Sequence, residues 1–183
     1  MQSGQPRGVR LRASVSCPRL PGVVPTRRVP GGSYSVGCQV IIQQRLLTDP
    51  AEFVRWMADE AVLDPRPRGV VRWTHANGDT CSGAFVELVP DRRVVFSNGR
   101  ERLEIGIPPG STTVEIDLHP TDEGSTRLRP VHHGLDDPMA GAHHGGWRHY
   151  LNRLRRLAAG DTPGADPFAT TRVPTPAELR TQQ

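Results

Sequence analysis

The sequence predicts an α+β domain in which a curved antiparallel sheet of about six or seven strands lies against one long C-terminal helix. Three observations carry this prediction. Between residues 69 and 133, apolar and polar side chains alternate in runs separated by turn signals such as Asn77-Gly78. A stretch with amphipathic helical spacing follows, from about Asp137 to Gly160. Two short helices precede the sheet, and 183 residues suffice for one domain with tails.

The two short helices are expected to meet at Asp49. Asp49 is a typical N-cap residue, Pro50 suits the first helical turn, and Glu52 completes a capping box. Apolar residues then recur at i, i+3 and i+4 from Phe53, which indicates one buried face.

Six strands are expected in the alternating region, joined by tight turns. Their predicted bounds are 69–75, 80–89, 93–97, 102–107, 112–119 and 126–132. The last of them contains Pro130, which has no N–H to donate to a ladder, so we expect an edge position or a bulge there.

The long helix is apolar on one face and rich in arginine on the other. A twisted sheet and a straight helix do not match in shape along their whole length, which predicts a ligand-sized cavity between them. Gly145 and Gly146 weaken this helix locally by about 1 kcal/mol each and remove two side chains. Two interpretations stay open for them, namely close packing of the helix on a strand or an entrance to the pocket.

The side chains expected to line the pocket are aromatic and apolar residues of the buried faces, together with one histidine. They are Trp56, Trp73, Phe85, Phe96, His132, Trp147, Tyr150, Leu151 and Leu154. His132 is interpreted either as a polar group of the pocket or as a hydrogen-bonded structural residue.

Four segments carry a resemblance to a known family. They are LLTDP (46–50), GAFVEL (83–88), RRVVF (92–96) and HGGW (144–147). In this order, and over roughly residues 40–168, the chain resembles the activator of Hsp-90 ATPase homologue-like family of the START-like (SRPBCC, polyketide cyclase-like) superfamily. The resemblance implies the helix-grip fold. The strand that opens the family's domain is not predicted by residues 20–38.

Composition divides the chain into three parts. Residues 1–38 are basic and are expected to be disordered or to come from a misassigned start. Residues 39–160 are expected to form the START-like SRPBCC domain. Residues 161–183 are expected to be a flexible tail, in which Phe168 contacts the domain.

Charge and hydropathy exclude two classes of partner. No acidic residue precedes Asp49, so the isoelectric point near 9.6 comes from the N-terminal part, and the domain itself is close to neutral. We therefore expect no nucleic-acid partner. No apolar run approaches the roughly 20 residues that cross a bilayer, so we expect no membrane partner.

No spacing in the sequence is typical of a metal site, a catalytic triad or a nucleotide loop. We therefore expect no metal and no cofactor, and catalytic residues stay unassigned. A general-acid role for Glu87 would require burial that raises its pKa. The three cysteines have no paired spacing, which favours a reducing cytoplasm.

Three functions remain open. The first is a non-enzymatic protein that binds a small apolar ligand, and the sequence favours it because an apolar pocket is all it needs. The second is a cyclase- or hydrolase-type enzyme of the same superfamily, which would need a buried acid–base pair. The third is a chaperone-interaction module, which the family name implies and which would need a large exposed apolar patch.

Overall fold

The computed structural model describes residues 29–30, 34–36, 40–121 and 125–181. All strands of these residues form one antiparallel sheet in the order β1-β8-β7-β6-β5-β4-β3, and β2 also pairs with β8. Six of them form a meander, namely β3 (Glu60–Leu63), β4 (Val70–Thr74), β5 (Thr80–Val89), β6 (Arg93–Asn98), β7 (Thr112–Pro120) and β8 (Thr126–His133). The predicted α+β helix-grip class is confirmed.

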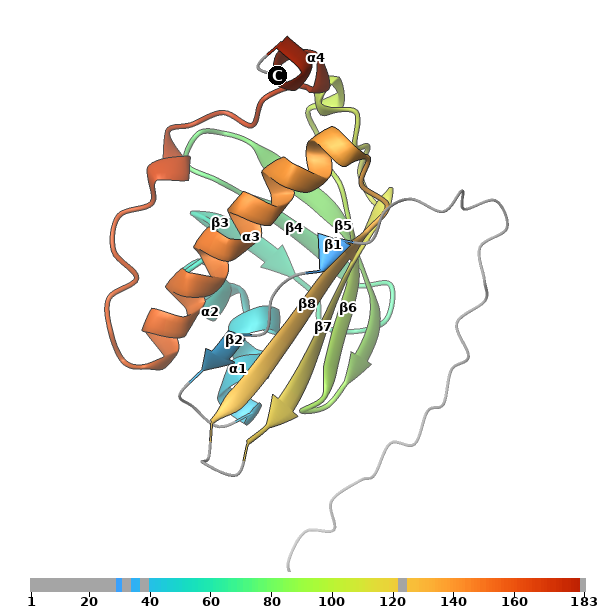
Figure 1. Cartoon of the computed structure of the whole chain (residues 1–183). Helices are drawn as coiled ribbons and strands as arrows, with labels where there is room; N and C mark the ends of the chain where they lie inside the picture. Colours follow the sequence, from blue (N-terminus) through green and yellow to red (C-terminus); the bar gives the residue numbers. More distant parts are fainter. Residues whose placement is uncertain (1–28, 31–33, 37–39, 122–124, 182–183) are drawn as a thin grey trace, which may run out of the picture.

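Helices α1 (Val40–Thr48) and α2 (Pro50–Phe53) meet at Asp49, as the sequence predicts. The Asp49 carboxylate caps α2 by accepting the Ala51 N–H at 3.0 Å. The long helix α3 (Asp137–Ala158) crosses one face of the sheet (Figure 1). Among the described residues, no helix has the length and hydrophobicity that spanning a bilayer requires.

The main core lies between the sheet and α3, because the inward residues of each strand alternate with outward polar ones. In β7, for example, Val114, Ile116 and Leu118 are buried, whereas Glu115 and Asp117 face outward and pair with Arg93. A second, smaller cluster lies at the start of α3 and contains Ile105, Ile107, Leu135, Met139 and Ala140.

Strands β1 (Val29–Pro30) and β2 (Tyr34–Val36) both pair with β8. The opening strand that the sequence does not predict is therefore present as two short pieces. Their registers cover Thr126–Leu128 and Val131–His132 of β8 and leave Pro130 between them, where its missing N–H breaks no described ladder. Most of residues 1–38 lie outside the described residues, and the domain limits at 38 and 160 stay a prediction.

One predicted strand is wrong. Residues 102–107 form no strand; Leu103–Ile105 is a single 3-10 turn, η1, followed by Gly106 with φ 73°. The alternation in this segment is misleading because Leu103 is 67% exposed while Ile105 is fully buried in the second cluster. The loop folds back on itself, since the Arg100 N–H donates to the Ile107 carbonyl at 2.7 Å.

Strand β3 is not predicted by the sequence, although its pairing with β4 is regular from Glu60↔Thr74 to Leu63↔Val71. It has four residues, and only Leu63 is buried, so its pattern is too short to distinguish a strand from a loop. It lies at the edge of the sheet.

After α3, residues 161–181 turn back along the helix; we call them the C-terminal strap. They contain η2 (Pro167–Ala169) and end in α4 (Pro176–Thr181), close to the N-terminal end of α3 (Figure 1). Val173 and Leu179 pack on the second cluster. The flexibility expected of this segment stays a prediction, but its contacts place it over the domain, with Phe168 among them.

Adding one methyl group at Gly83 should destabilise the fold. A Cβ at this position of β5 would lie 1.9 Å from the Ser97 carbonyl oxygen of β6, so the two strands would have to separate. We expect Gly83→Ala to lower the free energy of unfolding by about 1–3 kcal/mol. The control is Gly146→Ala, where a Cβ meets nothing within 4 Å and the helix should gain about 1 kcal/mol. Urea unfolding of both variants measures this, and equal stabilities would contradict the steric argument.

Candidate functional site

A cavity of about 380 Å³ lies between the sheet, α3 and the C-terminal strap. Its volume is in the range of about 300–1,000 Å³ that is typical of small-molecule sites. Its walls come from four parts of the chain: the sheet with the turn before β5 and the end of β6 (Trp73, His75, Asn77, Cys81, Asn98, Arg100), Met57, one side of α3 (Gly141, Ala142, His143, Gly145, Gly146, Trp147, Tyr150), and the strap (Phe168, Thr171, Arg172, Val173, Pro174, Leu179).

Three glycines of α3 lie in the wall of the cavity. Gly141, Gly145 and Gly146 all line it, and a Cβ at any of them would meet nothing within 4 Å. One of the two interpretations open for Gly145 and Gly146 is close packing of the helix backbone on a strand. It would place an atom of the sheet near a Cβ added at these positions. The structure instead places open space at both positions.

His132 lies behind the helix wall of the cavity and holds Trp147 in place. The Trp147 indole N–H donates to His132 Nδ1 at 3.1 Å. On the other side, His132 Nε2 lies 2.9 Å from the Thr112 hydroxyl, whose own hydrogen goes to the Asn98 carbonyl at 2.7 Å. The hydroxyl oxygen must therefore accept from His132 Nε2–H, which fixes a neutral ring with one acceptor and one donor.

His75 has the same role for a second pair of rings. Its Nε2 accepts the Trp73 indole N–H at 3.2 Å, so its Nδ1–H donates to the Tyr150 oxygen at 3.2 Å. Burial, followed by the charge of Arg100, lowers the pKa of His75 to about 4. Both aromatic side chains are thus oriented by a neutral imidazole.

His143 is the third neutral histidine of the site. Its Nδ1–H donates to the Met139 carbonyl one turn earlier in α3 at 2.9 Å, and its ring lies 5.3 Å from that of His132. Burial, followed by the charge of Arg100, lowers the pKa of His143 to about 4. Burial also holds the pKa of His132 well below its usual range. All three imidazoles serve as fixed dipoles at neutral pH.

Arg100 enters the cavity wall just beyond β6, where it forms an isolated bridge with Cys81. In the part of the chain that the structure describes, its Nε and Nη1 are buried without a hydrogen-bond partner, and so is the Oδ1 of Asn98. Glu101, the next residue in the sequence, pairs with Arg72, and Asp79 of the turn before β5 pairs with Arg102.

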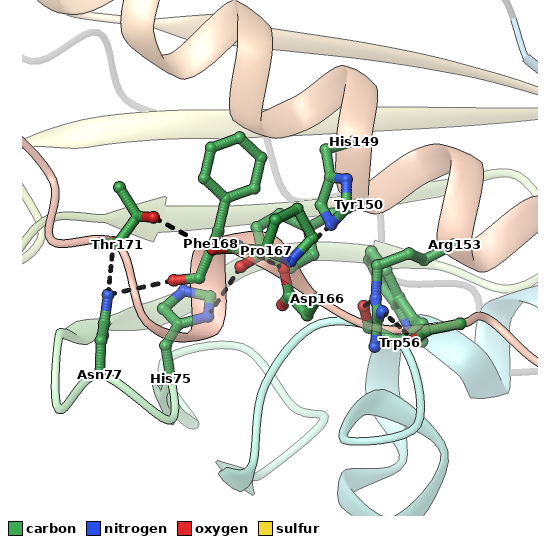
Figure 2. A network of polar contacts seen from close by, with 11 residues as sticks. Trp56, His75, Asn77, His149, Tyr150, Arg153, Asp166, Pro167, Phe168 and Thr171 are labelled. Carbon is green, nitrogen blue, oxygen red and sulfur yellow. Dashed lines mark hydrogen bonds and ion pairs between the residues drawn. The ribbon is translucent and has the colours of Figure 1, made fainter.

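The C-terminal strap is fastened to the sheet and to α3 by polar contacts (Figure 2). The Asn77 amide donates to the carbonyls of Phe168 and Thr171 at 3.3 and 2.8 Å. Asp166 pairs with His149 at 3.0 Å and accepts the Phe168 N–H at 2.9 Å. Phe168 is thereby held with its ring centroid 6.2 Å from that of Tyr150, at the rim of the cavity.

The structure divides the nine predicted pocket residues into three groups. Trp73, Trp147 and Tyr150 line the cavity, and His132 lies directly behind Trp147. The others lie in the packed core below the cavity, because their strand or helix positions face the centre of the sheet: Trp56, Phe85, Phe96, Leu151 and Leu154.

Three residues of the site are missed by sequence reasoning. His75 is the last residue of the predicted strand 69–75, and Arg100 follows the turn signal Asn98-Gly99, so neither has a local pattern that marks a binding residue. His143 lies in a pair of adjacent histidines without a metal-site spacing. Each of these residues reaches the cavity only because strand pairing and the strap bring together segments that are far apart in the sequence. No local sequence pattern indicates such contacts.

Glu87 does not fit the role of general acid. A β-bulge between Phe85 and Glu87 shifts the register of β5, which turns the Glu87 side chain outward. It is 51% exposed and pairs with Arg93 at 3.1 Å. In the part of the chain that the structure describes, no three metal-ligating side chains converge.

Residues 45–159 match the family model of the Activator of Hsp90 ATPase homolog 1-like protein. No curated protein matches significantly. An AHSA1-like protein from Rhizobium etli is 36% identical, over 81% of this chain and 91% of that one, with a TM-score of 0.59.

Two less similar structures share the fold. A protein from Mesorhizobium loti is 18% identical over 73% of this chain and 98% of its own, with a TM-score of 0.65. CalU16 from Micromonospora echinospora is 24% identical over 69% of this chain and 73% of its own, with a TM-score of 0.57. By its family match and its fold, the chain belongs to the Activator of Hsp90 ATPase homolog 1-like protein family of the SRPBCC superfamily.

Proposed function

We propose that the protein binds a small, largely apolar molecule in the cavity between the sheet, α3 and the C-terminal strap. The observation that carries this proposal is the construction of the cavity wall. Four aromatic rings line a volume of about 380 Å³, and three glycines of α3 add no side chain to its wall. The rings are those of Trp73, Trp147, Tyr150 and Phe168.

The hydrogen bonds of two of the three histidines at the site support binding rather than acid–base chemistry. His132 and His75 each use both ring nitrogens to hold aromatic side chains, so neither has a free nitrogen for a substrate proton. Such bonds preorganise the wall, which lowers the entropy lost when a ligand binds. A bound apolar molecule would gain about 25 cal/mol for each Å² of apolar surface removed from water.

A neutral apolar fluorophore, N-phenyl-1-naphthylamine, tests the proposal by titration. We expect saturable binding of one molecule per chain with a rise in emission. Trp147→Ala should weaken this binding at least tenfold, because it removes a large wall side chain that His132 holds. Trp147→Phe should retain more of the affinity than alanine, since it keeps an aromatic surface.

The matched control is Leu103→Ala, which removes an exposed apolar side chain outside the cavity and should change nothing. Absence of saturable binding to the wild-type protein would refute the proposal. Unchanged affinity in a folded Trp147→Ala variant would do so as well, because the fluorophore would then bind elsewhere.

A further inference from the structure

In the described part of the protein, Arg100 forms no ion pair with a carboxylate, and its side chain contacts the buried thiol of Cys81. Its backbone position is fixed, because Arg100 N–H donates to the Ile107 carbonyl and the residue forms a bridge with Cys81. Its Nε and Nη1 are buried without hydrogen-bond partners. By contrast, Arg93 on the outer face contacts three carboxylates.

The neighbouring carboxylates are positioned so that they do not neutralise Arg100. Glu101 binds the Arg72 guanidinium through both of its oxygens, at 2.7 and 3.0 Å. Asp79 binds Arg102 at 3.1 Å and the Val173 N–H at 3.0 Å. A guanidinium that is largely buried without a partner is costly, and proteins satisfy such groups with a partner or a ligand.

The rest of the wall leaves this cationic charge unopposed. Arg100 contributes to the lowered pKa of His75, His132 and His143, so all three rings stay neutral beside it. The other arginine of the wall, Arg172, is exposed on the strap. A fixed cationic charge in a mostly apolar cavity selects ligands that combine an apolar body with one anionic group.

We propose that the ligand is a small aromatic or alicyclic carboxylic acid, whose ring lies among Trp147, Tyr150 and Phe168 and whose carboxylate pairs with the Arg100 guanidinium. The inference rests on the proposed function, because it names the ligand class of the same cavity. Arginine is suited to this role, since its planar fork matches a carboxylate with two parallel N–H···O bonds.

Two compounds of nearly equal shape separate charge from apolar contact. These are 1-naphthylacetic acid and its neutral amide, 1-naphthylacetamide, with affinities measured by isothermal titration calorimetry at pH 7.5. We expect the acid to bind the wild-type protein at least tenfold more tightly than the amide. In Arg100→Met, the acid should lose at least tenfold in affinity and the amide much less, so that the preference for the acid disappears.

Two further variants sharpen the test. Arg100→Lys keeps the charge but not the fork, and should give an intermediate preference for the acid. Arg129→Met makes the same change in net charge on the exposed outer side of β8, and should leave the preference unchanged. Arg100→Met should also raise the melting temperature of the ligand-free protein, because it removes a largely buried cation without a partner.

The outcomes distinguish the inference from the proposed function. Two results would overturn the inference that a ligand carboxylate pairs with Arg100 and leave the proposed apolar binding unaffected. They are equal binding of acid and amide to the wild-type protein, and unchanged acid binding in Arg100→Met. Failure of both compounds while N-phenyl-1-naphthylamine still binds would overturn the carboxylate class alone. Failure of all three compounds would overturn both proposals together.

Discussion

Lowering the pH from 6.5 towards 4 should remove several kcal/mol from the free energy of unfolding. His75 and His143 have a pKa of about 4 in the folded protein, against 6.5 for an exposed histidine. A shift of this size corresponds to about 3 kcal/mol for each ring. His132 adds to the effect in the same direction, because burial holds its pKa well below the usual value.

The sign follows from which state binds more protons. Between the folded pKa values and 6.5, the unfolded chain holds protons on these histidines and the folded protein does not, so falling pH favours unfolding. The contribution of the neutral histidines to the free energy of unfolding is therefore complete above pH 6.5. It is lost as the pH falls towards their pKa values in the folded protein. Each histidine contributes a slope of up to about 1.4 kcal/mol per pH unit inside this window.

Urea unfolding at steps between pH 7.5 and 5 measures the slope, above the range in which most carboxylates titrate. His143→Leu should reduce it by up to about 1.4 kcal/mol per pH unit. The groups that act on His143 are the Arg100 and Asp136 charges and the Met139 carbonyl, and this variant leaves them in place. The exposed His144, changed to Leu, is the control and should leave the slope unchanged. A free energy of unfolding that does not change with pH in the wild-type protein would contradict the statement that three buried histidines are neutral in the folded state.

The sheet is predictable where a strand alternates over its whole length. Residues 112–119 are an example, because burial on one face enforces the period of two that the sequence shows. The segment 102–107 has the same alternation and still forms a 3-10 turn. Its apolar residues are buried in a second cluster built with α3 and the strap, a partner that lies far away in the sequence.

The candidate site is predictable on α3 and, for Trp73, on strand β4. Trp147 and Tyr150 share the buried face of an amphipathic helix, so helical spacing alone places them against the sheet. Arg100 and His75 reach the cavity through strand pairing, and Phe168 reaches it through contacts of Asn77 and Asp166. A lone arginine after a turn has no local signature of burial, so its unpaired charge becomes apparent only in three dimensions.

The second large effect is expected at Asp79, the buried carboxylate that fastens the C-terminal strap. Its Oδ1 pairs with Arg102 at 3.1 Å, and its Oδ2 accepts the Val173 N–H at 3.0 Å. Arg102 in turn donates to the Val173 carbonyl. The Asp79–Arg102 pair therefore binds both the N–H and the carbonyl of this strap residue. Asp79→Ala leaves Arg102 without a counter-charge, which we expect to cost about 3–5 kcal/mol.

The local consequence should be release of the strap, and trypsin can detect it. Cleavage after Arg172 requires the backbone at Val173 to leave its two partners. In Asp79→Ala, a peptide beginning at Val173 should therefore appear at least tenfold faster than in the wild-type protein. Asp79→Asn keeps a hydrogen-bond acceptor without the charge, and an intermediate rate would attribute part of the restraint to the ion pair.

Asp64→Ala is the matched control, because Asp64 forms an exposed ion pair with Arg66 and surface pairs contribute little. Cleavage at Arg172 in this variant should match the wild type. If Asp79→Ala unfolds the whole chain, cuts at the buried strands will appear together with the cut at Arg172, and Asp79→Asn then provides the test. Equal rates in all variants would mean that this pair does not hold the strap. Since Phe168, Val173 and Leu179 line the cavity, release of the strap should also weaken N-phenyl-1-naphthylamine binding, which connects the buried carboxylate to the ligand site.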